Sequence, residues 1–352
     1  MIPTEQKALI LQAKFGTFAL SSTVSVAKPK AGEVLIKVHA AALNPIDWKI
    51  RKYGLFIEEF PTILGSDVAG EVVELGEGVS ESQVKVGDRV IFQSSYHGSQ
   101  YAGFQEYAVG EVDTLAKIPS NITYEEASTV PGCFTTAYIA LYNVHPHGFD
   151  FDAPVTEGAK GKYNGIPMIV LGGSSSVGQS VIQMAKLSGF SPIITTASLK
   201  HAEYLKSLGA THVLDRNKGL TKDQVASITE VPIKAVFDAI SVTETQTAGF
   251  ELLASGGQLV TTLQPIPTLN DKASEEEKWV AWVHGAKKLP SNAELMKGTG
   301  SLLTALLENG DVKPNRVEVL SGGLNGIVDG LTRLENDTVS CVKLVVRPQD
   351  TA

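Results

Sequence analysis

Apolar and polar positions alternate in short runs over the first third of the chain. In residues 33–41 (EVLIKVHAA), Val34, Ile36 and Val38 fall on one face of an extended segment, and the other face carries a lysine and a histidine. This period of two is typical of a half-buried β-strand. The same pattern returns in residues 67–75 and 89–92, with glycines in the turns between them. The pattern predicts a compact, barrel-like β domain before residue 130.

Beyond residue 166, buried apolar runs alternate with helical segments. The run MIVLGG at residues 168–173 is typical of a buried strand, and residues 177–188 space their apolar side chains like a helix that stops at Gly189. Further strands are predicted at SPIITTAS, THVLD, KAVFDAI and QLVTT, with a helix at HAEYLKSLGA. This alternation predicts a doubly wound parallel sheet, the Rossmann architecture of the α/β class.

The remaining segments are less regular. Residues 125–143 are expected to be helical with a Pro-Gly interruption, and residues 145–165 are expected to form a surface loop. Residues 278–286 are expected to add one more strand, although the wider course of residues 267–298 cannot be derived from the pattern. The tail is expected to hold helices at 301–309 and 324–334 and a last strand at 342–348.

Composition narrows the class of protein. The 352 residues include 43% hydrophobic and 19% charged side chains, as in ordinary globular proteins. Thirty basic against 38 acidic residues give a net charge of −8, which argues against nucleic acid as the main partner. The two cysteines, Cys133 and Cys341, cannot form a disulfide framework or a four-thiolate zinc site. With no signal peptide or apolar run of membrane-spanning length, the chain is expected to be cytoplasmic and to have no membrane partner.

The clearest chemical signal is the run VLGGSSSVGQ at residues 170–179. A buried strand enters a glycine-serine turn and a helix leaves it, so that backbone N–H groups and the helix N-terminus can hold a pyrophosphate. The dinucleotide fingerprint falls on Gly173, Ser175 and Gly178, with serine where the strict pattern has its second glycine. The predicted phosphate-binding residues are Gly173, Ser174, Ser175, Ser176, Val177 and Gly178. A tight turn that binds nothing is the alternative.

The next strand indicates which cofactor is preferred. An NAD site has an Asp or Glu about 20 residues past the fingerprint to hold the ribose 2′-hydroxyl. Here the strand ends in TTASLK, with no carboxylate before Glu203. Ser198 can hydrogen-bond a 2′-phosphate and Lys200 can neutralise it, so NADP(H) is favoured over NAD(H). The alternative for Lys200 is a solvated lysine at a helix start.

Several segments together carry a family resemblance. They are NPIDWK at 44–49, LGSDVAG at 64–70, GDRV at 87–90, GFQEYA at 103–108 and the dinucleotide turn. With these motifs the chain resembles the medium-chain dehydrogenase/reductase superfamily over nearly its whole length. The resemblance implies a GroES-like, mainly-β catalytic domain built from residues 1–129 and 298–352. It also implies a Rossmann domain inserted between these two parts at residues 130–297.

The same motifs look most like the zinc-free branch, which includes quinone oxidoreductases and the fungal enoyl reductases that work with polyketide synthases. Zinc dehydrogenases of this superfamily carry a cysteine in the segment matching Asn44-Pro45 and Gly-His-Glu where this chain has Gly65-Ser66-Asp67. No metal site is therefore predicted. Without a Lewis acid, NADPH-dependent reduction of an activated C=C bond or a quinone is easier to explain than alcohol oxidation. The expected substrate is a small enone, enal or quinone, or an enoyl group on a carrier protein. A noncatalytic NADPH-binding protein and an oligomer both remain possible.

The resemblance also implies roles for single residues. Thr136 matches the position that contacts the nicotinamide, and the alternative is a threonine packed at the domain junction. Asn44 lies in the catalytic-cleft turn. There it orients the nicotinamide or the substrate, or its side chain only caps the backbone of the turn. Lys49 and Tyr53 are candidates to donate to the enolate oxygen or to supply the proton, which can instead come from water. Asp47 is expected to be a structural cap. Ile240 with Asp238 is expected to form a wall beside the cofactor, and Arg216 to stack on adenine. Lys343 resembles a family residue beside the cofactor, but a surface lysine is the favoured interpretation.

Overall fold

The computed structural model describes the whole chain except residues 95–96 and 156–157, and it divides into two compact units. The first unit contains residues 1–132, 297–310 and 314–352, so both ends of the chain build it. The second contains residues 133–296 and 311–313. Each unit is described by itself below.

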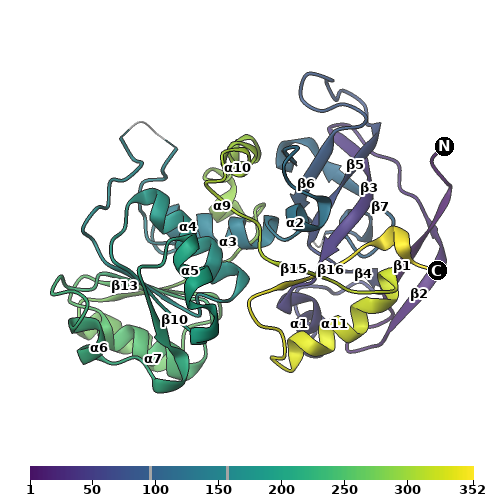
Figure 1. The fold of residues 1–352 in the computed structure, drawn as a ribbon. Helices are drawn as coiled ribbons and strands as arrows, with labels where there is room; N and C mark the ends of the chain where they lie inside the picture. The colour runs from purple at the N-terminus through teal and green to yellow at the C-terminus, as the bar shows by residue number, and fades with distance from the viewer. Residues whose placement is uncertain (95–96, 156–157) are drawn as a thin grey trace. The chain divides into compact units, whose positions relative to one another are not determined.

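The first unit is mainly β-structure (Figure 1). One sheet has the order β15-β16-β3-β5-β6-β8, with β7 paired to β3, and the other has the order β2-β1-β4. Its strands are β1 (Glu5–Leu11), β2 (Phe18–Ser25), β3 (Glu33–Ala42), β4 (Thr62–Ile63), β5 (Asp67–Leu75), β6 (Arg89–Gln93), β7 (Tyr107–Glu111), β8 (Ala116–Lys117), β15 (Val317–Val319) and β16 (Lys343–Val346). β3 and β5 run antiparallel over most of their length because their alternating apolar positions share one buried core.

Four helices cover or cap this unit. They are α1 (Pro45–Tyr53), α2 (Tyr124–Ser128), α10 (Thr299–Glu308) and α11 (Ile327–Glu335). α1 begins with proline at its first position and ends at Gly54, whose φ of 65° is left-handed. Leu324, Ile327 and Leu331 from the C-terminal part of the chain join the apolar core of the N-terminal strands.

The second unit is a parallel sheet with the strand order β11-β10-β9-β12-β13-β14. Its strands are β9 (Met168–Leu171), β10 (Ile193–Ala197), β11 (His212–Asp215), β12 (Ala235–Asp238), β13 (Gln258–Thr261) and β14 (Trp279–Trp282). Its helices are α3 (Pro131–Tyr142), which begins in the first unit, α4 (Ser176–Ser188), α5 (Ala202–Leu208), α6 (Lys222–Ala226), α7 (Thr243–Leu252), α8 (Pro267–Glu275) and α9 (Pro290–Ala293). The order reverses between β9 and β12, where open α/β sheets bind their ligands.

Packing of α7 and α4 uses opposite faces of this sheet. Gly249 of α7 lies directly on Leu171 and Leu259, whereas Ile182 of α4 approaches the turn at Gly173. Helices thus cover both faces of β9, which explains why its side chains are apolar at every position. The predicted Rossmann sheet and mainly-β domain are thus confirmed.

The segment from 145 to 165 differs in part from the expected surface loop. Its described residues form no helix or strand, but Phe149 is buried and Phe151 stacks on it with ring centroids 5.1 Å apart. Tyr163 and Phe190 extend the same aromatic cluster. This loop therefore packs onto the second unit through its aromatic side chains, which a search for periodic patterns cannot detect. Among the described residues, no helix is long and apolar enough to cross a membrane.

Candidate active site

The turn after β9 brings the backbone unusually close to its neighbours. Gly172 has a φ of 76°, and a Cβ there would lie 2.5 Å from Ile240. The N–H groups of Gly172 and Gly173 both donate to Thr196 of β10, at 3.0 Å. A Cβ on Gly178 would collide with the carbonyl of Gly172. Glycine is therefore required where α4 leaves the turn, as the fingerprint predicts.

Ser175 is the N-cap of α4. Its Oγ accepts a hydrogen bond from the N–H of Gly178 at 3.0 Å, which leaves the hydroxyl proton available for a ligand. Ser174, Ser176 and Val177 are half-buried around the same helix start. The N-terminus of α4, with its capped first turn and three serine hydroxyls, suits a pyrophosphate.

The ends of β10 and β11 lie side by side because Ala197 pairs with Asp215. Ser198 and Arg216, the next residue of each strand, therefore follow at the same sheet edge. Lys200 is exposed in a short 3₁₀ helix, Leu199–His201. The ends of these two strands thus present two cations and a hydroxyl near the predicted 2′-phosphate and adenine positions.

Two residues near this edge were not anticipated. The hydroxyl of Tyr204 in α5 donates to Oε1 of Gln179 at 3.1 Å, and Nε2 of Gln179 donates to the carbonyl of Ser174 at 3.1 Å. This chain of contacts connects the phosphate turn to α5. The available signal in the sequence was a glutamine directly after Gly178, the last glycine of the fingerprint.

The turn after β12 is fixed by Asp238. Its Oδ1 accepts hydrogen bonds from the N–H groups of Ile240 at 2.9 Å and Ser241 at 2.8 Å. Ser241 has a positive φ of 59°, which the carboxylate supports. Burial raises the pKa of Asp238, and the two N–H donors oppose that shift. Ile240 is thereby set beside Gly172, at the edge expected to form the cofactor wall.

Thr136 lies half-buried on α3, and Gly285 is next to it. A Cβ on Gly285 would overlap Oγ1 of Thr136. Sequence patterns did not identify Gly285, although the only glycine in the run KWVAWVHGAKK was the available signal. Only glycine at 285 lets this turn approach the threonine so closely.

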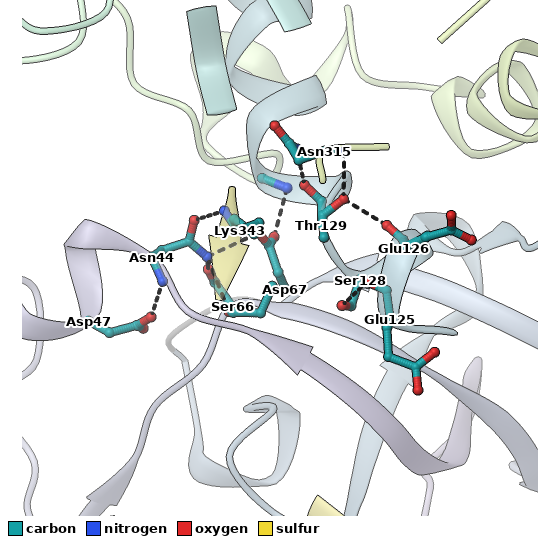
Figure 2. A network of polar contacts seen from close by, with 12 residues as sticks. Asn44, Asp47, Ser66, Asp67, Glu125, Glu126, Ser128, Thr129, Asn315 and Lys343 are labelled. Carbon is teal, nitrogen blue, oxygen red and sulfur yellow. Dashed lines mark hydrogen bonds and ion pairs between the residues drawn. The ribbon is translucent and has the colours of Figure 1, made fainter. Parts of the chain in front are cut away.

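Asn44 is the centre of a buried polar network in the first unit (Figure 2). Its Nδ2 donates to Oγ of Ser66 at 3.2 Å and to Oδ2 of Asp67 at 3.0 Å, and its Oδ1 accepts from Nζ of Lys343 at 2.6 Å. Lys343 also pairs with Oδ2 of Asp67 at 3.4 Å, and Oδ1 of Asp67 accepts from the N–H of Gly132 at 2.7 Å. The side-chain amide of Asn44 is thus committed to this network.

Lys343 is not the surface lysine expected from the sequence. Its side chain is 5% exposed, and Asp67 is fully buried. A buried ammonium needs a carboxylate and hydrogen-bond acceptors, and Asp67 and Asn44 supply them. The error arose because the partners lie about 300 positions away in the sequence, at 44 and 67.

Asp47 is fully buried on the first turn of α1, where its Oδ2 accepts a hydrogen bond from the N–H of Asn44 at 2.8 Å. Its expected role as a cap is confirmed. Burial raises the pKa of Asp47 to about 7, with a smaller push from the charge of Asp67. The N–H of Asn44 and the ammonium of Lys343 oppose this rise.

Lys49 and Tyr53 are one helical turn apart on α1, at positions that share a face. Burial lowers the pKa of Lys49, and Asp337 partly opposes this. Tyr53 is 53% exposed. Within the part of the chain that the structure describes, neither residue joins the hydrogen-bonded network of Asn44 in Figure 2.

The described residues contain no group of three or more His, Cys, Asp or Glu side chains able to hold a metal ion. Asn44, Ser66 and Asp67 match the zinc-ligand segments of the zinc dehydrogenases. Here Asn44 and Asp67 contact the ammonium of Lys343, and Ser66 accepts a hydrogen bond from Asn44.

Comparisons with known proteins fit this geometry. Residues 30–120 match the alcohol dehydrogenase GroES-like domain, and residues 176–262 match the family described as zinc-binding dehydrogenase. A trans-enoyl reductase of Fusarium sp. is 30% identical over 98% of this chain and 99% of its own length. This chain belongs to the zinc-free branch of the medium-chain dehydrogenase/reductase superfamily. The membership predicted from the sequence motifs is confirmed.

Solved structures of this superfamily share the fold. A quinone oxidoreductase from Coxiella burnetii has a TM-score of 0.75 at 24% identity, covering 97% of this chain and 99% of that one. A crotonyl-CoA carboxylase/reductase in complex with NADP has a TM-score of 0.75 at 18% identity, covering 99% and 96%. Within the superfamily, the relatives support an oxidoreductase that uses a nicotinamide cofactor for enoyl reduction.

Proposed function

We propose that this protein uses NADPH to reduce the activated C=C bond of an α,β-unsaturated carbonyl compound, without zinc. The observation that carries the proposal is the similarity to trans-enoyl reductases along almost the whole chain. Two separate features agree with it. The second unit has a dinucleotide turn, and the first unit has a buried ammonium at the positions that match zinc ligands.

The residues of the second unit fit the cofactor. Gly173, Gly178 and the hydroxyls of Ser174, Ser175 and Ser176 would hold the pyrophosphate at the start of α4. Ser198 and Lys200 would hold the 2′-phosphate, and Arg216 would stack on the adenine. Ile240 would form a wall of the site, and Thr136 would contact the nicotinamide. NADPH, when bound, supplies a hydride to the electron-poor β-carbon of the substrate.

The remaining task for the protein is to stabilise the enolate and deliver a proton. Lys49 suits this role because its lowered pKa makes the ammonium a better acid than an ordinary lysine. Tyr53 is the second candidate donor, one turn further along α1. Asn44, with its amide held by Lys343, Ser66 and Asp67, would present a fixed edge to substrate or nicotinamide.

The charge already present in the network of Asn44, Asp67 and Lys343 supports the proposed zinc independence. The ammonium of Lys343 neutralises Asp67, and neither Asn44 nor Ser66 offers the thiolate or imidazole that zinc prefers.

The domain boundaries proposed for the catalytic and cofactor-binding parts remain 1–129 with 298–352, and 130–297. A cytoplasmic location is proposed with them.

Three alternatives differ in their substrates or activity. A quinone oxidoreductase would reduce quinones and no alkenes. A trans-acting enoyl reductase of a polyketide synthase would reject free small enones and accept an enoyl group on a carrier protein. A noncatalytic NADPH-binding protein would bind the cofactor and reduce nothing.

The test is turnover with a defined panel of acceptors. Purified protein is mixed with NADPH and with 2-alkenals, enones, quinones, free enoyl thioesters and enoyl-loaded carrier protein, and loss of NADPH absorbance is followed. Turnover of an enoyl thioester, unchanged after chelation and with less than one zinc per chain, is the expected result. Quinone turnover alone, or activity lost on chelation and restored by zinc, would contradict the proposal.

A further inference from the structure

The segment after β14 forms a tight turn at residues 284–286. The N–H of Ala286 donates to the carbonyl of His284 at 2.8 Å, and Gly285 between them lies against Thr136. Trp282 anchors the preceding residues, because its indole N–H donates to the carbonyl of Thr262 at 3.3 Å. The position of this turn is therefore set relative to the sheet on one side and to α3 on the other.

A buried amide holds both flanks of Gly285. Asn292 of α9 is 1% exposed, and its Nδ2 donates to the carbonyls of His284 and Ala286, each at 2.8 Å. Both hydrogens of the amide are thus used on the two residues that flank the glycine. A side chain that accepts instead of donating there would face two carbonyl oxygens.

A second buried amide connects Asn292 to the helix that carries Thr136. Asn143, directly after α3, donates from Nδ2 to Oδ1 of Asn292 at 2.9 Å and to the carbonyl of Ser291 at 3.0 Å. Its Oδ1 accepts from the N–H of Val144 at 3.0 Å. Thr136 and Asn143 are seven residues apart, close to two helical turns, and so lie on the same side of α3. The two amides thus link α3 to the turn at Gly285.

We propose that Asn292 is a positioning residue that, together with Asn143, holds the turn at residues 284–286 against Thr136 at the nicotinamide end of the cofactor site. The inference rests on the proposed function, in which Thr136 contacts the nicotinamide. The adenine half of the cofactor would be held elsewhere, at the start of α4 and after β10. Loosening this pair should therefore affect the nicotinamide half selectively.

The test compares two ligands that differ in the nicotinamide. NADPH has it, whereas 2′-phospho-ADP-ribose keeps the pyrophosphate and 2′-phosphate and lacks it. Asn292→Asp should weaken NADPH binding about tenfold, because buried donors to two carbonyls are lost, and should leave the truncated ligand within about twofold. Asn143→Asp, which loses the donor to Asn292 and keeps the acceptor for Val144, should act in the same direction.

A matched control is Asn315→Asp. Asn315 is also buried, and its Nδ2 donates to the carbonyl of Thr129 at 2.9 Å in the first unit. This variant should leave the ratio of the two affinities unchanged. Turnover by Asn292→Asp with the best acceptor should fall in kcat about tenfold or more, since hydride transfer is sensitive to nicotinamide placement.

Equal weakening of both ligands by Asn292→Asp, or weakening of neither, would overturn the inference. The same holds if wild-type protein binds both ligands equally, because the nicotinamide would then not be held at all. Wild-type protein that binds NADPH more tightly but reduces no acceptor would contradict the proposed reaction alone. The affinity ratio in the variants would then still decide the role of Asn292.

Discussion

Under the proposed function, the choice between NADPH and NADH depends on two side chains that follow β10. If Ser198 and Lys200 bind the 2′-phosphate, replacing both by alanine removes charge-assisted hydrogen bonds that only NADPH can make. Ser198→Ala with Lys200→Ala should weaken NADPH about 100-fold and NADH about twofold or less. Titration of protein fluorescence with each cofactor measures both constants.

The control for that pair is Lys206→Ala. Lys206 is another exposed lysine of the same region, paired with Glu203 at 2.9 Å in α5. Its loss should change neither constant, so that a general effect of surface charge is separated from direct contact. Equal losses for NADPH and NADH in the double variant would disprove the 2′-phosphate assignment.

Lys49 makes a second prediction at this scale, concerning pH. Its ammonium is the proton-donating form, and burial lowers its pKa below the ordinary value of 10.5. As pH rises through that lowered pKa, kcat/KM should decline. Lys49→Arg should keep activity to higher pH, and Lys49→Met should lower kcat/KM about 10- to 100-fold at neutral pH. Initial rates from pH 6 to 10 measure this.

Tyr53→Phe is the companion variant, because Tyr53 lies one turn away and is largely exposed. A profile unchanged in Lys49→Met, with Tyr53→Phe strongly impaired, would assign the proton to the tyrosine. Profiles unchanged in both variants would indicate that water supplies it.

Single residues also show where sequence reasoning reaches its limit. The glycines of the phosphate turn were predictable because the fingerprint has a fixed local spacing, and the cap at Asp47 because its partner Asn44 lies three positions away. Lys343, Gly285 and Asn292 were not, because each contacts a residue far away in the sequence, namely Asn44, Thr136 and Asn143. No local period distinguishes a buried lysine from a solvated one.

At the scale of elements, the N-terminal cap of helix α1 should make the stability of the protein depend on pH. Asp47 is fully buried, and its pKa of about 7 lies above the ordinary value of 3.8. Between pH 4 and 7 the folded protein therefore holds a proton that the unfolded chain has released. The contribution of Asp47 to the free energy of unfolding should therefore fall as pH rises across this window, by about 1.4 kcal/mol per pH unit.

Asp47→Asn should remove this contribution. Relative to wild type, the variant should gain stability steadily from pH 4 to pH 7 and show no further gain above it. Urea unfolding at several pH values measures the difference, in which the opposite slopes of other carboxyl groups such as Glu318 cancel. Parallel curves for the two proteins would mean that Asp47 is ionised throughout.

Strands and helices with a strong period were predicted close to their observed bounds. β3, β5 and α4 begin and end within a residue of the expected positions, since their apolar faces define them. Elements of two to four residues such as β4, β8 and α9 had no detectable period. Their bounds are set by the pairing and packing partners that the fold supplies.

At the scale of the whole molecule, the two ends of the chain meet in one sheet. β16 lies beside β3 (Figure 1) and runs antiparallel to it, with Val345 opposite Ala42. Lys343 at the start of β16 joins Asn44 and Asp67. The family resemblance implied a first domain made from both chain ends. Local patterns alone could not have paired a C-terminal strand with β3, because loop closure over about 300 residues leaves no trace in the sequence.

This arrangement makes Lys343 important for stability. Replacing it by methionine leaves Asp67 buried without its counter-charge, a change that costs about 3–5 kcal/mol in comparable pairs. Lys52→Met, which breaks an exposed pair with Glu335 at 2.8 Å in the same unit, should cost much less, because solvent screens that pair. Chemical unfolding of both variants measures the contrast.

The double variant Lys343→Met with Asp67→Asn separates charge from packing. An asparagine at 67 can still accept the N–H of Gly132 but no longer needs a cation, so it should recover much of the lost stability. If Lys343→Met is no more destabilising than Lys52→Met, the buried pair with Asp67 does not stabilise the fold. If the double variant recovers no stability, Lys343 stabilises the fold through its packing, and the charge of its ammonium is not the cause.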